Sequence, residues 1–250
     1  MSAEHIIETR AVSKRFGGFT ALKDVSVGMQ RGQLTSIIGP NGAGKSTYFN
    51  LLSGAFAPSE GQVLFDGRDV TGLRPHEFAH IGIAKSFQIT NLFPNLTVLE
   101  NVRIALQAKV SRYGLWRRRS ELGALRDEAM DLLRTVGLVD RAARQARELA
   151  HGQQRALEIA VALAARPKLL LMDEPTAGMS PEETRSMMDL IRRLVGERTI
   201  VLVEHKMKMV MGISDRIVVL HHGELLAQGG PDDIRSNDMV KRVYLGQGQH

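Results

Sequence analysis

Hydrophobic and polar residues follow different periods in different parts of the chain. Up to about residue 88, short segments such as 25–29 and 61–67 alternate apolar and polar positions between turn residues, which is typical of antiparallel strands. From residue 96 to about 165 the apolar positions recur at helical spacing. The segment 121–136 places six apolar residues on one helix face: Leu122, Leu125, Ala129, Leu132, Leu133 and Val136.

A third pattern begins after Pro167, which ends the preceding helical stretch. Apolar runs at 169–172, 199–203 and 216–220 alternate with helical segments at 181–195 and 206–213. This alternation predicts a mostly parallel sheet. We therefore predict one α/β domain over residues 1–250. Its core comprises residues 1–88 and 166–250 and includes an antiparallel β subdomain, while residues 89–165 form an inserted helical subdomain.

The clearest chemical signal lies between an apolar run at 34–38 and a helical segment at 48–53. It fits G-x-x-x-x-G-K-[ST] and reads Gly39, Pro40, Asn41, Gly42, Ala43, Gly44, Lys45, Ser46, Thr47. Strand, glycine-rich loop and helix together indicate a P-loop, whose backbone N–H groups surround phosphates. We expect Lys45 to reach the β- and γ-phosphates and Ser46 to hold Mg²⁺.

A second motif consists of two carboxylates at the end of an apolar run. Residues 169–172 are apolar and are followed by Asp173 and Glu174. An unbroken apolar run reads as a strand buried on both faces, and α/β sheets bind ligands beyond the carboxyl ends of their strands. Asp173 then fits a residue that holds Mg²⁺ either directly or through the other ligands of the ion, and Glu174 fits the base that orients an attacking water.

These motifs, with several others in the same order, resemble those of the ATP-binding cassette (ABC) ATPases. Residues 149–155 are similar to the family's L-S-G-G-Q signature, and residues 177–180 stand at the position of its D-loop. Gln88 matches the Q-loop glutamine and His205 the switch histidine. Phe16 matches the aromatic residue that stacks on adenine. The resemblance covers nearly the whole chain.

The resemblance implies a catalytic cycle and a set of roles. ATP and Mg²⁺ are the implied cofactors, with Ser46, Gln88 and Asp173 around the metal. Glu174, His205, Lys45 and Gln88 are the implied catalytic residues. Two cassettes, identical or related, pair head to tail, so that the signature of each faces the P-loop of the other.

The signature variant and the segments 89–101 and 204–215 are similar to those of the LivG-type ATPases. These ATPases power importers of branched-chain amino acids and related hydrophobic or amide compounds. The implied partners are membrane permease subunits and, indirectly, a solute-binding protein. The implied location is peripheral, on the cytoplasmic face of the bacterial inner membrane. Two alternatives share these motifs: an ATPase of the lipopolysaccharide-export type, and a soluble ABC ATPase of iron–sulfur cluster assembly. An ATPase acting on nucleic acid would normally carry a coiled-coil insertion or tandem cassettes, so no nucleic-acid partner is expected.

The signature departs from the family pattern at two positions. Ala150 replaces the serine whose hydroxyl contacts the partner's γ-phosphate, and His151 replaces the first glycine. The backbone N–H groups and the dipole of the helix that begins near Gly152 remain available to a phosphate. His151 either donates a bond there or faces solvent. Gln153 completes the motif.

The composition and the lengths of the apolar runs narrow the class of protein further. There is no cysteine, and the net charge is +6 from 33 basic and 27 acidic residues, which we interpret mainly as a solvated surface. No apolar run approaches the roughly 20 residues of a transmembrane helix, and residues 1–5 lead directly into a strand without the pattern of a signal peptide. We therefore expect a protein that is soluble by itself, with any membrane role supplied by a partner.

Two further segments leave alternatives open. Residues 89–101 include Leu92, Phe93 and Leu96 around a proline turn. Phe93 could dock against a membrane subunit or pack inside the helical subdomain. The basic and aromatic residues 111–119, among them Trp116, either form a solvated loop, pair a ring with an arginine or touch lipid head groups. The many methionines are expected to fill the core.

Overall fold

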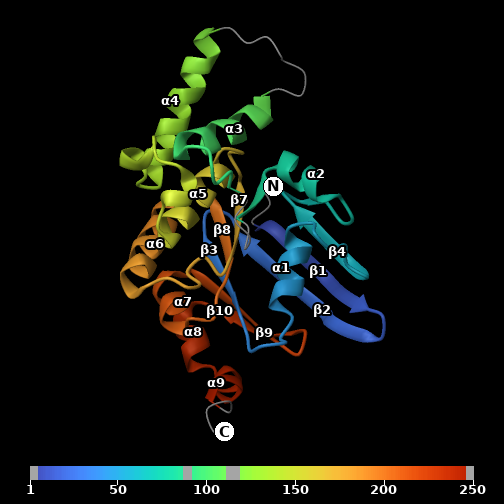
Figure 1. Ribbon diagram of the computed structural model, residues 1–250. Helices are drawn as coiled ribbons and strands as arrows, with labels where there is room; N and C mark the ends of the chain where they lie inside the picture. Colours follow the sequence, from blue (N-terminus) through green and yellow to red (C-terminus); the bar gives the residue numbers. More distant parts are fainter. Residues whose placement is uncertain (1–4, 87–91, 111–118, 246–250) are drawn as a thin grey trace. The chain divides into compact units, whose positions relative to one another are not determined.

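The computed structural model describes residues 5–86, 92–110 and 119–245 (Figure 1). Its contacts divide the chain into two compact units. The core unit comprises Met1–Ile83, Lys168–Glu174 and Leu194–His250, and the helical unit comprises Ala84–Pro167 and Pro175–Arg193. The sequence analysis assigned residues 175–193 to the core, whereas in the structure they belong to the helical unit. The reason is that the helix at 181–194 packs against the start of the helix at 151–163, where Gly152 is bonded to Glu183.

The smaller sheet of the core unit is antiparallel, as the alternating segments predicted. Its strand order is β2-β1-β4-β5, with β1 at His5–Phe16, β2 at Phe19–Gln30, β4 at Glu60–Phe65 and β5 at Arg68–Asp69. β1 and β2 form a hairpin that turns at Gly17 and Gly18.

The larger sheet carries the parallel strands, and its order is β10-β9-β3-β8-β7-β6. Its strands are β3 (Leu34–Ile38), β6 (Ile83–Ser86), β7 (Leu169–Asp173), β8 (Thr199–Val203), β9 (Arg216–His221) and β10 (Glu224–Gly229). Every residue of β3 and β8 is buried. Strands covered on both faces are rich in apolar and β-branched residues, and the buried polar exceptions here are Thr35, Ser36 and Thr199.

Alternate residues of this sheet enter two hydrophobic clusters. Ile37 and Val218 join α1 (Lys45–Leu52) and the small sheet in one cluster. Ile38 and Val219 point the other way, as neighbouring strand residues must, into a second cluster. The second cluster includes residues of α7 (Met207–Ile213), α8 (Pro231–Ser236) and α9 (Asp238–Leu245). Met207 and Met211 pack against it, so the prediction that they fill the core is confirmed. The core unit also contains α2 (Pro75–Ile81).

The helical unit consists of four helices and two short 3-10 turns in its described part. The helices are α3 (Val98–Val110), α4 (Arg119–Thr135), α5 (His151–Leu163) and all but the last residue of α6 (Pro181–Leu194), and the turns are Val139–Arg141 and Ala146–Glu148. On the predicted apolar face of α4, Leu125, Ala129 and Leu133 are buried. The side chain of Leu122 lies outside the described residues.

Candidate functional site

Three neighbouring parallel strands of the core unit end at the same edge of the sheet. β8 lies between β3 and β7, and Val203 of β8 pairs with Ile37 on one side and with Asp173 on the other (Figure 1). The segments that follow the three strands are therefore neighbours: the glycine-rich loop after β3, Glu174 after β7 and His205 after β8. This is the edge at which α/β sheets bind ligands.

The loop after β3 depends on glycine at its end. Gly44 caps α1 with φ 94°, a left-handed conformation that L residues avoid. A Cβ atom there would lie 2.8 Å from the carbonyl oxygen of Ala21, so a side chain at this position would push the loop away from β2. The helix begins at Lys45, three residues before the helical segment predicted from the sequence. Its first N–H groups have no intrahelical partner and are available to an anion.

Lys45 lies against the loop that precedes it. Its Nζ donates hydrogen bonds to the carbonyl oxygens of Gly39 and Pro40 at 2.7 and 2.8 Å. Burial lowers the pKa of the Lys45 ammonium, and the carboxylate of Glu174 acts in the opposite direction. The lysine and the glutamate of the two sequence motifs therefore influence each other electrostatically.

One cavity of about 300 Å³ joins the two motifs. Its lining residues are Phe19, Ala21, Asn41, Gly42, Ala43, Gly44, Lys45, Ser46, Thr47 and Glu174. Cationic, hydroxyl and backbone donors of the loop after β3 thus share one space with the carboxylate of Glu174, which follows β7 two strands away. Such a set can hold polyphosphate and place a base beside it.

Glu174 has an unusual backbone conformation. Its φ is +45°, and its N–H donates to the carbonyl oxygen of Val203 at 2.9 Å. Positive φ at a residue other than glycine costs free energy and concentrates at functional sites. The Nδ1 atom of His205 lies 3.6 Å from Oε1 of Glu174, too long for a hydrogen bond but close enough for a small movement to join them.

A comparison with models of known protein families identifies the family of this chain. The family model described as ABC transporter matches residues 22–177, from β2 to beyond Glu174. The chain belongs to the ABC transporter family. It is 41% identical to the high-affinity branched-chain amino acid transport ATP-binding protein LivG of Salmonella typhimurium, over 98% of this chain and 99% of that protein.

Solved ABC cassettes have the same fold. The ADP conformation of MJ1267, an ATP-binding cassette of an ABC transporter, superimposes with a TM-score of 0.85 and 32% identity over 96% of this chain and 98% of that one. A dimeric post-hydrolysis structure of the cassette MJ0796, bound to ADP and Pi, has a TM-score of 0.75 and 31% identity over 90% and 98% of the two chains. The fold predicted for this cassette is therefore confirmed.

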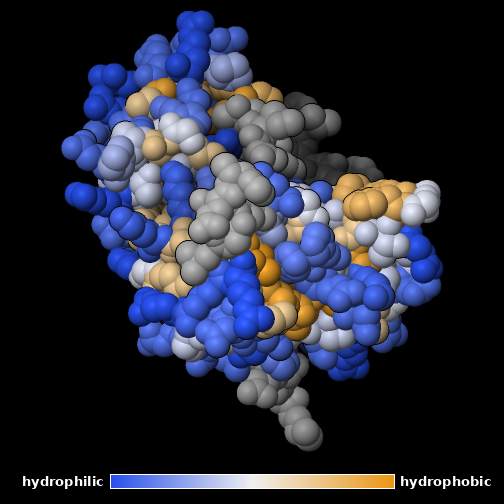
Figure 2. Space-filling model, turned by 90° about the horizontal axis from the view of Figure 1, so that it is seen from below, coloured by the Kyte–Doolittle hydropathy of each residue, from blue (hydrophilic) through white to orange (hydrophobic). Residues whose placement is uncertain are grey.

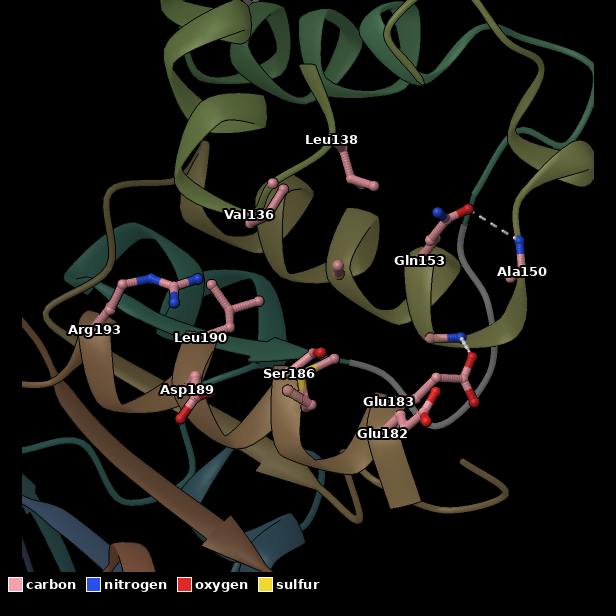
Figure 3. A pocket seen from close by; sticks show the side chains of 14 residues that line it. Val136, Leu138, Ala150, Gln153, Glu182, Glu183, Ser186, Asp189, Leu190 and Arg193 are labelled. Atoms are coloured by element: carbon pink, nitrogen blue, oxygen red, sulfur yellow. Dashed lines mark hydrogen bonds between the residues drawn. The ribbon is translucent and has the colours of Figure 1, made fainter. Parts of the chain in front are cut away.

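The signature segment of this ABC cassette lies in the helical unit. Ala150 caps α5 without a side-chain bond, and its N–H donates to Oε1 of Gln153 at 3.3 Å. The N–H of Gly152 donates to Oε1 of Glu183 on α6 at 3.2 Å (Figure 3). Both Ala150 and His151 are exposed. The helix start therefore presents backbone groups and no hydroxyl.

Glu183 occupies a central place in this unit. Its Oε2 accepts from the N–H of Ser180 at 2.9 Å, and the Ser180 hydroxyl bonds the N–H of Glu183 at 3.2 Å, which together form a capping box for α6. The Ser180 and Gly152 N–H groups hold the pKa of Glu183 below its usual value. The sequence interpretation missed this residue, although S-x-x-E before an amphipathic helix is a recognisable signal.

A larger cavity of about 640 Å³ lies between the start of α5, α6 and the end of α4 (Figure 3). Its walls combine apolar side chains such as Leu138 and Leu190 with Glu182, Glu183 and Arg193. Gly152 and Glu183 both line this cavity and are joined by a hydrogen bond, so movement of α6 would act directly on the signature helix.

Several other predicted site residues do not line the 300 Å³ cavity at the glycine-rich loop, which we call the phosphate cavity. Phe16 is absent from its lining, whereas Phe19 and Ala21 of β2 belong to it. The sequence missed Phe19, although it stands directly opposite Phe16 across the Gly17-Gly18 turn. Asp173 and His205 also lie outside the lining. Gln88 and residues 111–118 lie outside the described residues.

Phe93 is 51% exposed, so the alternative that it packs inside the helical unit is wrong. Its N–H and carbonyl oxygen are both bonded to the side chain of Asn101, at 2.7 and 3.1 Å. Asn101 is itself buried. The exposed ring of Phe93 therefore projects from a backbone turn that the buried side chain of Asn101 holds by hydrogen bonds.

Most of the surface visible in Figure 2 is hydrophilic, with apolar atoms gathered in small areas. Within the described ranges, no helix combines the length and apolar character needed to cross a bilayer.

Proposed function

We propose that this chain is the ATP-hydrolysing subunit of an ABC importer for branched-chain or other hydrophobic amino acids or related compounds. The full-length similarity to LivG supports an importer over an exporter or an iron–sulfur assembly ATPase. Its partners are membrane permease subunits, a second cassette and, indirectly, a solute-binding protein. It works at the cytoplasmic face of the membrane as a peripheral subunit.

In the proposed reaction the loop N–H groups and Lys45 hold the β- and γ-phosphates, which requires Lys45 to exchange the carbonyl oxygens of Gly39 and Pro40 for phosphate oxygens. Glu174 orients and polarises the water that attacks the γ-phosphate. His205, 3.6 Å from Glu174, steadies that carboxylate and the transferred group. Charge developing on the phosphate is thus met by groups already in place.

The oxygen donors fit a Mg²⁺ ion. Ser46 lines the cavity, and Asp173 ends β7, two strands away from β3 in the sheet. Mg²⁺ prefers such hard oxygen ligands and keeps several waters, so two protein ligands together with phosphates suffice, and Gln88 is the third expected contact. When bound, the ion would neutralise phosphate charge.

A dimeric arrangement completes the site. The dimeric MJ0796 structure supports a second cassette as partner. Ala150, His151, Gly152 and Gln153 would then face the γ-phosphate held by the other chain, with backbone N–H groups replacing the missing hydroxyl. The segment around Phe93 would carry the resulting movement to a permease subunit, because an exposed aromatic side chain gains free energy when a partner covers it.

The observation that carries this proposal is the position of Glu174 in the same cavity as Lys45 and Ser46. Glu174→Gln removes the charge and keeps the shape, so ATP binding should persist while turnover is lost. The ATP-bound dimer should then accumulate on size-exclusion chromatography with ATP and Mg²⁺. Glu197→Gln is the matched control, because that carboxylate is 78% exposed and pairs with Arg198 on the surface. Wild-type turnover in Glu174→Gln would refute the role of Glu174.

A further inference from the structure

The 640 Å³ cavity of the helical unit extends along α6 and has two ends with different surroundings (Figure 3). At one end Glu183 accepts a hydrogen bond from the N–H of Gly152, at the start of the signature helix. The other end, which we call the distal end, lies around Asp189, Leu190 and Arg193. The volume is within the range of about 300–1,000 Å³ that small-molecule sites occupy, and the distal end has no part in the proposed ATPase reaction.

The distal end has an apolar floor. Val136 and Leu138, which follow α4, and Leu190 of α6 all line the cavity and are all buried. An apolar wall beside an open space gains free energy when an apolar ligand group covers it. The floor therefore favours a ligand with a hydrocarbon side chain.

Two side chains of opposite charge stand at the edge of this floor. Asp189 and Arg193 are four residues apart on α6, so they are neighbours on one face of the helix. Asp189 lies 3.8 Å from Arg192, which is beyond hydrogen-bonding distance. Among the described residues, the guanidinium of Arg193 has no carboxylate or hydrogen-bond partner. An acid and a base, not paired with each other, are thus presented to the same space.

We propose that the distal end binds a branched-chain amino acid, the class of solute that the importer of Proposed function carries. Such a molecule has a carboxylate, an ammonium group and an apolar side chain around one carbon atom. Arg193 binds the carboxylate through charge-assisted hydrogen bonds, Asp189 binds the ammonium group, and the side chain covers Leu138 and Leu190. The choice of ligand rests on the proposed function, whereas the complementarity rests on the cavity itself.

The site has a consequence for the ATPase, because α6 carries both the distal end and Glu183. In this structure Glu183 holds the N–H of Gly152, whereas the proposed ATP-bound dimer requires that N–H to face the γ-phosphate of the other chain. A ligand that joins α6 to Val136 and Leu138 stabilises the present position of the helix. A ligand shifts an equilibrium toward the state that it binds better, so imported solute should lower the rate of ATP hydrolysis.

The binding test uses leucine and two analogues, titrated into the full chain by isothermal titration calorimetry. 3-Methylbutylamine lacks the carboxylate of leucine, and 4-methylpentanoate lacks the ammonium group. Arg193→Gln should weaken leucine binding about 10- to 150-fold, the loss expected for a hydrogen bond between charged groups, and leave 3-methylbutylamine unchanged. Asp189→Asn should weaken leucine and leave 4-methylpentanoate unchanged. A folding defect would weaken all three ligands together.

Arg185→Gln is the matched control. Arg185 is an exposed arginine of the same helix and is absent from the cavity lining. The substitution removes the same charge from α6 as Arg193→Gln does. Leucine affinity should stay within about twofold of wild type.

The ATPase test measures hydrolysis with increasing leucine. Leucine should lower the rate of the wild-type chain and of Arg185→Gln. The rate of Arg193→Gln without leucine should equal that of wild type, and leucine should no longer lower it.

Three results would overturn the proposal. The wild-type chain could bind none of leucine, isoleucine and valine. Leucine affinity could survive in both Arg193→Gln and Asp189→Asn, which would place the amino acid elsewhere. Bound leucine could leave the ATPase rate unchanged or raise it, which would refute the coupling through α6. A chain that binds leucine as described but hydrolyses no ATP would instead refute the proposed function and leave the site in place.

Discussion

Asn101 holds the turn that carries Phe93, and its replacement gives a sharp test of the helical unit. Its Oδ1 accepts from the N–H of Phe93 at 2.7 Å, and its Nδ2 donates to the carbonyl oxygens of Phe93 and Thr97 at 3.1 and 2.9 Å. The residue is 3% exposed, so water cannot easily replace these partners. A single side chain therefore ties the backbone of the turn to the start of α3.

The expected cost follows from these three bonds. Each contributes about 0.5–1.5 kcal/mol net, and a buried group left without a partner costs about 1–3 kcal/mol. Asn101→Ala should therefore lower the free energy of unfolding by about 2–4 kcal/mol. Asn95→Ala is the control, because Asn95 is exposed in the same turn and such changes usually stay within about 0.5 kcal/mol.

The assay is urea denaturation followed by circular dichroism, with the midpoint as readout at unchanged slope. Hydrogen exchange adds a local readout. The Phe93 amide, bonded to Asn101 in the wild type, should exchange faster in Asn101→Ala and not in Asn95→Ala. A loss below about 1 kcal/mol, or unchanged exchange at Phe93, would refute the view that Asn101 holds this turn.

Three other predictions concern binding, coupling and pH. Lys45→Ala removes a charged donor worth about 1.5–3 kcal/mol, so a fluorescent ATP analogue should bind about 10- to 150-fold more weakly; unchanged affinity would contradict the role of Lys45. Phe93→Asp should leave the melting temperature and the ATPase of the isolated chain near wild type and abolish stimulation by permease subunits; a sharp fall in stability would count against docking. Burial raises the pKa of Glu158 above 4.5 more than Arg155 lowers it, so the folded state favours the protonated carboxyl, and the stabilisation that this form gives is lost as the pH rises through the raised pKa. Glu158→Gln should accordingly gain stability relative to wild type as the pH rises above about 4.5, and a relative loss in urea midpoints over that rise would contradict the shift.

The sequence alone determined the strands and the chemistry at their ends. Residues 34–38 and 199–203 were located to the residue, because strands buried on both faces are rich in apolar and β-branched residues. The glycine-rich loop was equally clear, since few sequences satisfy both its turns and its phosphate contacts. Asp173 and Glu174 followed from their position after such a run.

Only the tertiary structure decided which of these groups share a cavity. The pairing of Val203 with both Ile37 and Asp173 brings Glu174 beside Lys45, and no local pattern reveals strand order. The same holds for the contact of Gly152 with Glu183, which joins two helices distant in the chain. Periodicity reports which face of an element is buried, but the partner on that face is set by long-range packing, which the sequence of the element does not contain.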